Sequence, residues 1–565
     1  MTKLSARLLL TTSFVLSAAA LTACGGSSSS GPSAVFPPPP PPPTGSSGPT
    51  YTKGVFQASD RFDAQCQSPR SGSDPDGNRY PDTAGSTLLE KFWLRSWSNE
   101  TYLWNTEIED RDPNSIASRT AYFDVLKSNE LSETGSGKEK DDFHFSESTE
   151  DFFARRNSTA ESGYGVRFTS LGPRDSEGRS ITPRDFRILY TEPNSPASTV
   201  EQGKVNFPRG ARILEVDGAD LVNGNDTTTL NNGLFPTTAG ERHTFKIREA
   251  ITNVEREITI TSADIAPEPV NRTSIINTTD GKKIGYMLFN TFSPRSSEKS
   301  LADAFTQFSN ANVDDLVIDL RYNGGGLVAV AAQMGYMIAG PSRTAGKTAA
   351  LLQYNEAAGN RDPSTGEVVE PFPFIDRGVG FSVPTTQNLD TVNLPRVFIL
   401  STGGTCSARE LVLNSLRGID HEVILIGDTT CGKPYGFVPT DNCGQTYYTI
   451  QFQSVNDKGQ GDYSDGFSPA DSANQFSEKL TGCSIDDDLT RELGDENEAL
   501  LATALYYREN GMCPVTTSKP SVKPQSKMYR AADGNDENIL SLKSDPFVVS
   551  VDSYLDPTLP NSGSR

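Results

Sequence analysis

Residues 396–427 read RVFILSTGGTCSARELVLNSLRGIDHEVILIG. The first apolar run, 396–401, ends in a Gly-rich turn, and an amphipathic stretch over 407–418 precedes a second apolar run over 422–427. This order of strand, helix and strand is typical of an α/β unit with parallel strands. Because the ends of adjacent parallel strands share one edge of a sheet, the loops that follow the two runs are expected to meet.

Apolar runs of the same kind lie N-terminal to this unit. Residues 283–290 read KIGYMLFN and residues 313–320 read VDDLVIDL, and the helical stretch AVAAQMGYMIA follows over 329–339. Strands that alternate with helices in this way predict an α/β core domain, which we place at 269–515.

Two further regions precede the core. From Gly163 onward, short β-branched runs separated by turns predict a compact β-rich domain over 161–268. Large apolar residues recur at mostly helical spacings near residue 90, which predicts a small helical region within 53–160. We expect these residues to form a local core: Leu88, Leu89, Phe92, Trp93, Trp97 and Tyr102. The chain is thus predicted to be a multidomain α/β protein.

The N-terminus has the composition of a secretion signal. Residues 1–24 carry Lys3 and Arg7, then an apolar stretch, and end in Leu21-Thr22-Ala23-Cys24. This segment resembles the bacterial lipoprotein signal, which implies cleavage before Cys24 and lipidation of its sulfur and amine. The sequence has no other apolar stretch long enough to span a membrane. We therefore expect a lipid-anchored protein of the bacterial cell envelope, on the outer membrane and facing the periplasm or the cell surface.

Two segments are predicted not to fold. Residues 25–52 combine Gly/Ser tracts with consecutive prolines, which predicts a tether between anchor and folded part. Residues 516–565 are polar and rich in Pro and Ser with little periodicity, which predicts a disordered tail.

The net charge is −21, from 72 acidic and 51 basic residues. The field of such a protein repels nucleic acid, so we expect no nucleic-acid partner and membrane contact only through the lipid anchor. No His/Cys spacing suits zinc, and we expect no metal and no cofactor. The acidic run Asp486-Asp487-Asp488 lacks the spacing of a calcium loop and is expected to be a solvated face.

Seven cysteines become six once Cys24 is set aside as the lipidation site. An even number in an oxidising compartment makes disulfides plausible. The pair Cys431 and Cys443 flanks a short loop and is the one locally attractive pairing.

Ser407 follows the Gly-rich turn at the start of the predicted helix 407–418. At that position, free amides and the positive end of the helix dipole stabilise an alkoxide and the oxyanion formed after attack, so Ser407 is a candidate nucleophile. The alternative is an ordinary helix N-cap, a common position for serine.

Lys433 lies in GDTTCGKPYGF, after the next predicted strand. Its apolar neighbours Pro434, Tyr435 and Phe437 favour desolvation, which lowers the pKa of an amine towards that of a useful base. The alternative is a surface lysine on a turn. The segment also fits the phosphate-loop pattern GxxxxGK, but Pro434 supplies neither the hydroxyl nor the N–H that a nucleotide site needs.

A third turn, Asn323-Gly324-Gly325-Gly326, joins the predicted strand 313–320 to the helical stretch. Glycines at such a turn let backbone amides approach a bound group closely. Nucleotide-binding folds use the same device, so the turn alone does not identify the chemistry.

Together these motifs resemble the C-terminal-processing, or tail-specific, serine peptidase family, whose members place a PDZ domain before a core with a serine-lysine dyad. The resemblance covers roughly 161–510 and includes Asp319-Leu320-Arg321-x-Asn323-x-Gly325-Gly326, Ser407-Ala408 and Gly432-Lys433. It implies that Ser407 is the nucleophile, Lys433 the base, and the amides of Gly325 and Ala408 the oxyanion hole. The stretch 493–507 resembles the closing helix of the family.

The segment 161–268 resembles a PDZ domain through three motifs: Gly163-Tyr164-Gly165-Val166, Asn194-Ser195-Pro196-Ala197 and the stretch 209–218. A PDZ domain adds a peptide as a strand to a sheet edge and binds its terminal carboxylate with loop amides. The resemblance implies that Gly163, Tyr164, Gly165 and Val166 bind the C-terminus of a substrate. A purely structural β-domain is the alternative.

The sequence departs from the peptidase pattern in two respects. Many members carry a glutamine four residues after the lysine, and here that position is Phe437, so Gln445 or Tyr447 is a candidate substitute. The related tricorn-like branch uses a histidine from before the PDZ domain, which makes His144 an alternative base.

The expected function is that of an extracytoplasmic serine endopeptidase. Its partners would be polypeptides with free C-termini, and its substrates unfolded or C-terminally exposed proteins. The alternative is a non-catalytic peptide-binding lipoprotein with a degenerate peptidase fold.

Overall fold

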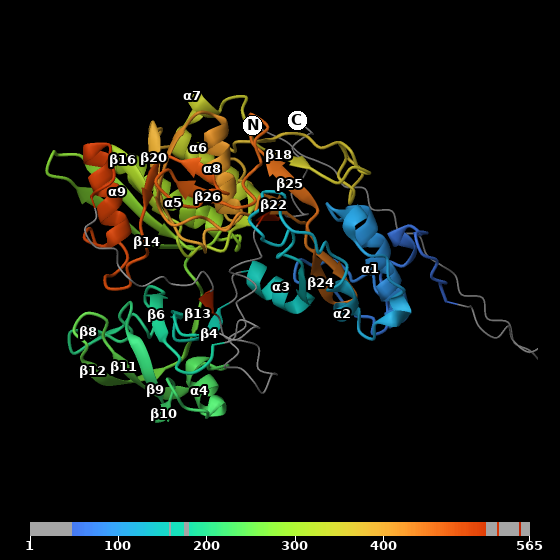
Figure 1. Cartoon of the computed structure of the whole chain (residues 1–565), viewed down its shortest axis with the longest axis horizontal. Helices are drawn as coiled ribbons and strands as arrows, with labels where there is room; N and C mark the ends of the chain where they lie inside the picture. Colours follow the sequence, from blue (N-terminus) through green and yellow to red (C-terminus); the bar gives the residue numbers. More distant parts are fainter. Residues whose placement is uncertain (1–47, 158–159, 174–179, 516–527, 530–552, 555–565) are drawn as a thin grey trace, which may run out of the picture. The chain divides into compact units, whose positions relative to one another are not determined.

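The computed structural model describes residues 48–157, 160–173, 180–515, 528–529 and 553–554 (Figure 1). The signal peptide predicted over 1–24, with Cys24, and nearly all of the predicted linker lie outside the described residues. Most of the tail predicted to be disordered over 516–565 also lies outside them. Its described residues form two short strands, β29 (Met528–Tyr529) and β30 (Ser553–Tyr554).

A six-stranded sheet forms the centre of the core domain. Its order is β14-β15-β16-β20-β21-β28, with β14 antiparallel to β15 and the remaining neighbours parallel. The bounds are β14 Val270–Asn277, β15 Lys283–Phe289, β16 Asp315–Asp319, β20 Arg396–Ser401, β21 Glu422–Gly427 and β28 Gly482–Ser484. The predicted α/β class is confirmed, and the apolar runs at 283, 313, 396 and 422 are strands of this sheet.

Helices cover both faces of this sheet. Alternate residues of the central strands accordingly belong to two different apolar clusters. Met287 and Ile318 pack with residues of α5 (Ser297–Ala311), α6 (Val328–Ala339) and α8 (Ala408–Gly418). Tyr286 and Val317 face the other way and pack with α9 (Ala499–Asn510). Figure 1 shows α9 on one side of β16 and β20 and α6 and α8 on the other. Burial of both faces explains why the strands read as continuous apolar runs.

The segment 161–268 forms a second, mainly antiparallel sheet with its own apolar cluster. The order is β12-β11-β9-β6-β5-β29, with β10 paired to β9, so the tail strand β29 adds to the edge at β5. The bounds are β5 Val166–Ser170, β6 Phe186–Thr191, β9 Arg212–Val216, β10 Ala219–Asp220, β11 Arg242–Arg248 and β12 Glu255–Thr261. Helix α4 (Thr227–Leu234) packs on it, and β4 (Glu161–Gly163) pairs with β13 (Ala263–Ile265).

The N-terminal region is helical where the aromatic spacing predicts it. Helix α1 (Thr87–Thr101) begins at the N-cap Ser86, whose side chain accepts from Leu89 N, and buries Phe92, Trp93 and Trp97. Short helices follow at α2 (Arg119–Phe123) and α3 (Thr149–Arg156). Strand β3 (Phe145–Ser148) joins β24 (Gln445–Tyr448) and β23 (Thr440–Asn442), so this region shares a sheet with residues of the core.

The remaining elements are short. They are η1 Ser59–Arg61, β1 Gln65–Cys66, β2 Thr83–Ala84, η2 Asn105–Glu107, η3 Pro113–Ser115, β7 Val200–Glu201, β8 Lys204–Val205, β17 Gly326–Leu327, α7 Pro341–Thr344, β18 Thr348–Gln353, β19 Phe372–Pro373, β22 Tyr435–Gly436, β25 Phe452–Val455, β26 Phe467–Pro469 and β27 Glu478–Leu480. Among the described residues, no helix has both the length and the apolar character needed to cross a membrane.

Candidate active site

Ser407 lies at the sharp turn between strand β20 and helix α8. Its backbone has φ 60° and ψ −109°, a conformation that a residue with a side chain rarely adopts. Strained backbone of this kind persists where the surrounding structure enforces it, and a strand-to-helix turn of this type exposes the nucleophile in other hydrolases. Ser407 is 1 % exposed and precedes Ala408, the first residue of the helix. The amide of Ala408 belongs to the first turn, where helix amides have no intrahelical acceptor.

The carboxylate of Glu410 joins the Ser407 turn to the Lys433 loop. Its Oε2 accepts the backbone N–H of Ser407 at 2.9 Å and that of Lys433 at 2.8 Å. Its Oε1 accepts the N–H of Gly432 at 2.8 Å and the hydroxyl of Thr430. Glu410 is fully buried, so one side chain holds the two predicted catalytic residues next to each other. The sequence analysis missed this residue, although Ser-x-x-Glu at a helix start is the signature of a capping box.

Lys433 is 1 % exposed, not a surface lysine. Its Nζ lies 4.5 Å from the ring centroid of Phe143 and 4.5 Å from that of Phe437. The residue that replaces the family glutamine, Phe437, is therefore one wall of the lysine site. The predicted apolar surroundings of Lys433 are present, with Phe143 from the N-terminal region as the other wall.

A second buried lysine, Lys138, supports the same loop and was not recognised in the sequence. Its Nζ donates to the carbonyl oxygens of Cys431 at 2.6 Å, Gly432 at 3.3 Å and Ser464 at 3.1 Å. Burial lowers the pKa of Lys138 below the ordinary lysine value, although the nearby Glu410 acts in the opposite direction. Lys138 and Gly432 line a cavity beside this loop. Lys138 lies in a polar segment, and only the tertiary contact marks it.

The Gly-rich turn lies against the Ser407 turn. Arg409 Nη1, one residue into the helix after Ala408, donates to the carbonyl of Leu320 at 3.0 Å and to that of Gly404 at 2.6 Å. The amide of Gly325, a predicted oxyanion donor, donates instead to Asn323 Oδ1 at 2.8 Å. In this conformation, therefore, that amide is used within its own turn.

The next residue, Gly326, approaches another backbone segment closely. It has φ 131°, and a Cβ at this position would lie 2.4 Å from the carbonyl carbon of Phe292. Only glycine fits this place. Gly326 and Leu327 form β17, which pairs with the tail strand β30.

A buried ionic network lies behind this turn. Arg321 binds Asp319 at 2.8 Å, Asp487 at 2.7 Å and Glu498 at 2.7 Å, and all four side chains are at most 1 % exposed. Arg209, from the second sheet domain, binds the same Asp487 at 2.9 Å. The expectation that the run 486–488 is a solvated face is thus wrong for Asp487, because these two guanidinium groups compensate its charge in the interior.

Three disulfides connect the six described cysteines. They are Cys66–Cys443, Cys406–Cys431 and Cys483–Cys513. The predicted pairing of Cys431 with Cys443 is wrong, because Cys431 is bonded to Cys406 beside the Ser407 turn and Cys443 to Cys66 of the N-terminal region. Cys406 precedes Ser407 and Cys431 lies just before Lys433, so their disulfide is a covalent link between the two loops.

His144 is buried and both ring nitrogens are engaged. Nε2 bonds the carbonyl of Phe123 at 2.8 Å and therefore carries the proton, and Nδ1 lies 3.2 Å from the hydroxyl of Thr449, from which it accepts. Burial lowers the pKa of His144 below its ordinary value. These contacts give His144 a structural role in the N-terminal region.

The two candidate substitutes for the family glutamine make other contacts. Gln445 Nε2 donates to Ser146 at 3.0 Å, and Tyr447 packs against Trp93 and Phe123. A different glutamine, Gln451, lies on the chain next to the Lys433 loop, since its N–H donates to the carbonyl of Gly436 at 2.9 Å. Gln451 Nε2 is buried without a hydrogen-bond partner in the described part of the chain.

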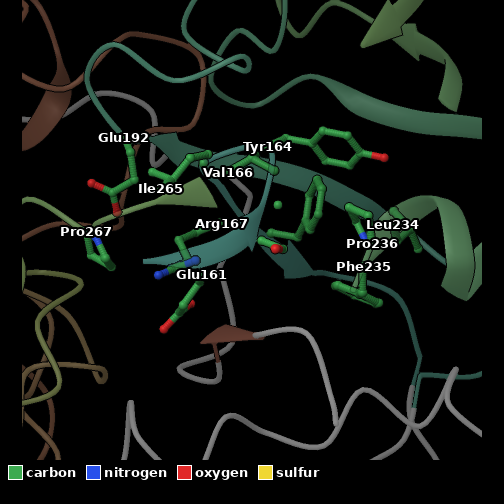
Figure 2. Close-up of a pocket in the computed structure, with 14 residues that line it drawn as sticks. Glu161, Tyr164, Val166, Arg167, Glu192, Leu234, Phe235, Pro236, Ile265 and Pro267 are labelled. Atoms are coloured by element: carbon green, nitrogen blue, oxygen red, sulfur yellow. The ribbon is translucent and has the colours of Figure 1, made fainter. Parts of the chain in front are cut away.

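The four residues predicted to bind a peptide C-terminus line one pocket of the second sheet domain. Gly163, Tyr164, Gly165 and Val166 border it together with the end of α4 (Figure 2). Gly165 has φ 71°, and a Cβ there would lie 2.3 Å from that of Ser195, so the turn requires glycine. Tyr164 is a core residue whose hydroxyl donates to the carbonyl of Gly233 at 2.8 Å. Its backbone, not its ring, is therefore the part that can contact a ligand.

No candidate metal site of three or more His, Cys, Asp or Glu side chains occurs in the described part of the chain.

A comparison with family models places part of this chain beside a family of peptidases. Residues 283–456 match the model of Peptidase family S41, so this part of the chain is similar to the S41 peptidases. The match includes the Gly-rich turn, Ser407 and Lys433. No curated protein matches the chain.

Solved structures include several similar chains. A Bacteroides fragilis NCTC 9343 protein described as an S41 protease is 23% identical, covers 77% of this chain and 98% of its own length, and has a TM-score of 0.55. It shares the fold of this chain. The photosystem II D1 C-terminal processing protease is 17% identical over 74% of this chain and 100% of its own, with a TM-score of 0.40. Mature CPAF is 14% identical over 68% and 91%, with a TM-score of 0.31.

Proposed function

We propose that this protein is a serine endopeptidase in which Ser407 is the nucleophile and Lys433 the general base. The observation that carries the proposal is the shared Glu410 oxygen, which binds the backbone amides of both residues. Neutral Lys433 takes the proton of Ser407 Oγ as that oxygen attacks a peptide carbonyl. The ammonium then protonates the leaving amine, and water hydrolyses the acyl-enzyme by the same route in reverse.

The oxyanion of the tetrahedral intermediate needs backbone donors close to Ser407. The first-turn amide of Ala408 is one candidate. The second predicted donor, Gly325, must release Asn323 Oδ1 before its amide can contribute. We infer that substrate binding reorients this peptide unit, a change that the neighbouring glycines permit.

The proposed substrates are unfolded or C-terminally exposed proteins outside the cytoplasm. The loop Gly163–Val166 would bind the terminal carboxylate, and the substrate would add as a strand beside β5. The lipid anchor at Cys24 would hold the enzyme in the bacterial cell envelope. The proposed reaction uses side chains, backbone amides and water, without a cofactor.

Hydrolysis of an unfolded protein and of a short fluorogenic peptide tests the mechanism. Ser407→Ala and Lys433→Ala should each lower kcat by roughly 10⁴-fold or more, with little change in peptide affinity. Lys458→Ala, at an exposed lysine, is the matched control. Full activity of Ser407→Ala would refute the proposal. Loss of activity in His144→Ala with a native fold, together with an active Lys433→Ala, would transfer the base role to His144.

The same assay distinguishes the proposed peptidase from the alternative of a non-catalytic peptide-binding protein. If the wild-type protein binds peptides with free C-termini but hydrolyses none of them, the protein is a peptide-binding lipoprotein with a degenerate peptidase fold.

A further inference from the structure

The edge strand of the second sheet domain is occupied by the chain's own tail. Strand β29 runs antiparallel to β5, with Met528 opposite Thr169 and Tyr529 opposite Phe168. From Met528 to Tyr529 the tail therefore runs towards Val166 and the Gly163–Val166 loop. A peptide bound by strand addition with its C-terminus at that loop would need the same direction and the same edge.

A second part of the tail lies at the candidate active site. Strand β30 pairs in parallel with β17, with Ser553 opposite Gly326 and Tyr554 opposite Leu327. It also contacts β22, which begins at Tyr435, two residues after Lys433. The tail thus lies between the Gly-rich turn and the lysine loop, where a scissile peptide would have to lie.

The sequence of the tail suits this placement. The run Pro546-Phe547-Val548-Val549-Ser550-Val551 ends one residue before Asp552, which precedes β30, and it contains three valines, a residue type enriched in strands. Residues 530–552 connect the two strands, and a stretch of that length can extend over roughly 80 Å. One tail is therefore long enough to occupy both surfaces of the same molecule.

We propose that the C-terminal tail of this protein is an intramolecular ligand that occupies the edge of β5 through residues 528–529 and the active-site strand β17 through residues 553–554. This proposal rests on the proposed peptidase function, because the occupied surfaces are those assigned to substrate. The tail acts as a competitive, displaceable inhibitor. In the Gly-rich turn next to the bound tail, the Gly325 N–H donates to Asn323 Oδ1. This N–H is therefore not directed at the tail as an oxyanion donor.

The inhibitor role predicts a rate increase when the tail is released. If the tail occupies the site in roughly nine of ten molecules, release raises the apparent affinity for substrate about tenfold. Because the ligand and its site belong to one chain, the inhibition should not depend on protein concentration, in contrast to pairing between two copies.

Proline substitutions in the full-length chain test the proposal, since proline cannot donate to a strand ladder. The variants are Met528→Pro with Tyr529→Pro, and Ser553→Pro with Tyr554→Pro. Asn535→Pro with Asn538→Pro is the matched control in the same tail. Amide hydrogen exchange, measured in a Ser407→Ala background to keep the tail intact, reports occupancy without any catalysis. Initial rates on a short fluorogenic peptide, measured with active Ser407, report inhibition.

We expect the 553–554 variant to raise amide exchange at Gly326, because the Leu327 N–H donates to the carbonyl of Phe292 and not to the tail, and to raise kcat/KM about tenfold at every protein concentration. The 528–529 variant should raise exchange at Phe168, whose N–H faces the tail, while Thr169 faces β6. The control should change neither quantity. Unchanged exchange in both test variants would overturn the proposal and leave the peptidase function standing.

The two proposals fail in different ways. If exchange rises as expected but no variant hydrolyses any substrate, the tail is confirmed as the occupant of both surfaces and the peptidase function is refuted. Exchange differences that grow with protein concentration would assign the tail to a second copy and overturn the intramolecular proposal.

Discussion

Glu410 Oε2 accepts the backbone N–H of Lys433 at 2.8 Å while it also holds the N–H of Ser407. The carboxylate is fully buried and has donors on both oxygens. It therefore fixes the relative position of the proposed nucleophile and base without touching a substrate, and we regard it as a positioning residue.

Glu410→Gln should lower kcat about 100-fold with a smaller effect on KM, because the amide NH₂ cannot accept and one pair of loop amides loses its partner. Steady-state kinetics on the fluorogenic peptide measure this effect, with Glu422→Gln at the exposed start of β21 as the control. Equal kcat in the two variants would show that Glu410 does not position the pair.

Lys138→Met should lower kcat about tenfold, because three carbonyl oxygens of the loops at Cys431–Gly432 and Ser464 lose their common donor. Lys140→Met is a matched control, since Lys140 binds carboxylates of the same region, Glu107 at 2.7 Å and Glu133 at 3.5 Å. Both variants should keep the wild-type circular dichroism spectrum. A loss of activity in the Lys140 variant as large as that in the Lys138 variant would point to a general disturbance of the cavity.

Arg321→Met should lower the free energy of unfolding by about 3–5 kcal/mol, because Asp319, Asp487 and Glu498 would remain buried without their shared cation. Arg377→Met is the control: Arg377 and Asp376 form an exposed pair with 48% and 50% of their side chains accessible, which contributes about 1 kcal/mol or less. Urea denaturation of both variants at neutral pH gives the comparison. A loss below about 1 kcal/mol for Arg321→Met would mean that the network relaxes or takes up protons.

His421 should make the protein less stable in acid. Burial lowers its pKa from 6.5 to about 4, with a further contribution from Arg343. Neither ring nitrogen has a hydrogen-bond partner among the described residues. As the pH falls, the imidazole of His421 is protonated in the unfolded chain before it is protonated in the folded protein. The contribution of neutral His421 to the free energy of unfolding is therefore fully present above pH 6.5 and is lost as the pH falls from 6.5 to about 4.

The loss due to His421 amounts to roughly 3 kcal/mol at the lower pH. His421→Gln should remove that part of the pH dependence, and urea denaturation between pH 7.5 and 4.5 measures it. Parallel stability curves for the wild type and the variant would contradict the assignment. The buried His144, whose pKa is also lowered, should leave a residual dependence of the same sign in the variant.

Local patterns in the sequence account for much of the core. The apolar runs at 283, 313, 396 and 422 became parallel strands, and the amphipathic stretch after Ser407 became α8, because burial of both sheet faces imposes a periodicity that can be read over a few residues. The aromatic spacing near residue 90 likewise predicted α1 and its buried face.

Contacts between segments far apart in the sequence could not be predicted from local patterns. The partner of Cys431 is Cys406 and not the nearby Cys443, and Asp487 is buried because Arg321 and Arg209 reach it from elsewhere in the chain. Composition describes a residue's average environment, whereas these residues owe theirs to particular partners.

The sequence by itself determined the α/β class, the position of Ser407 at a helix start and the position of Lys433 in the loop after the next strand, because each depends on residues close together in the chain. Only the tertiary structure decided that Glu410 and Lys138 hold the lysine loop and that the tail pairs with β5 and β17. These are pairings between groups far apart in sequence, and their energy depends on complementary partners that local spacing does not specify.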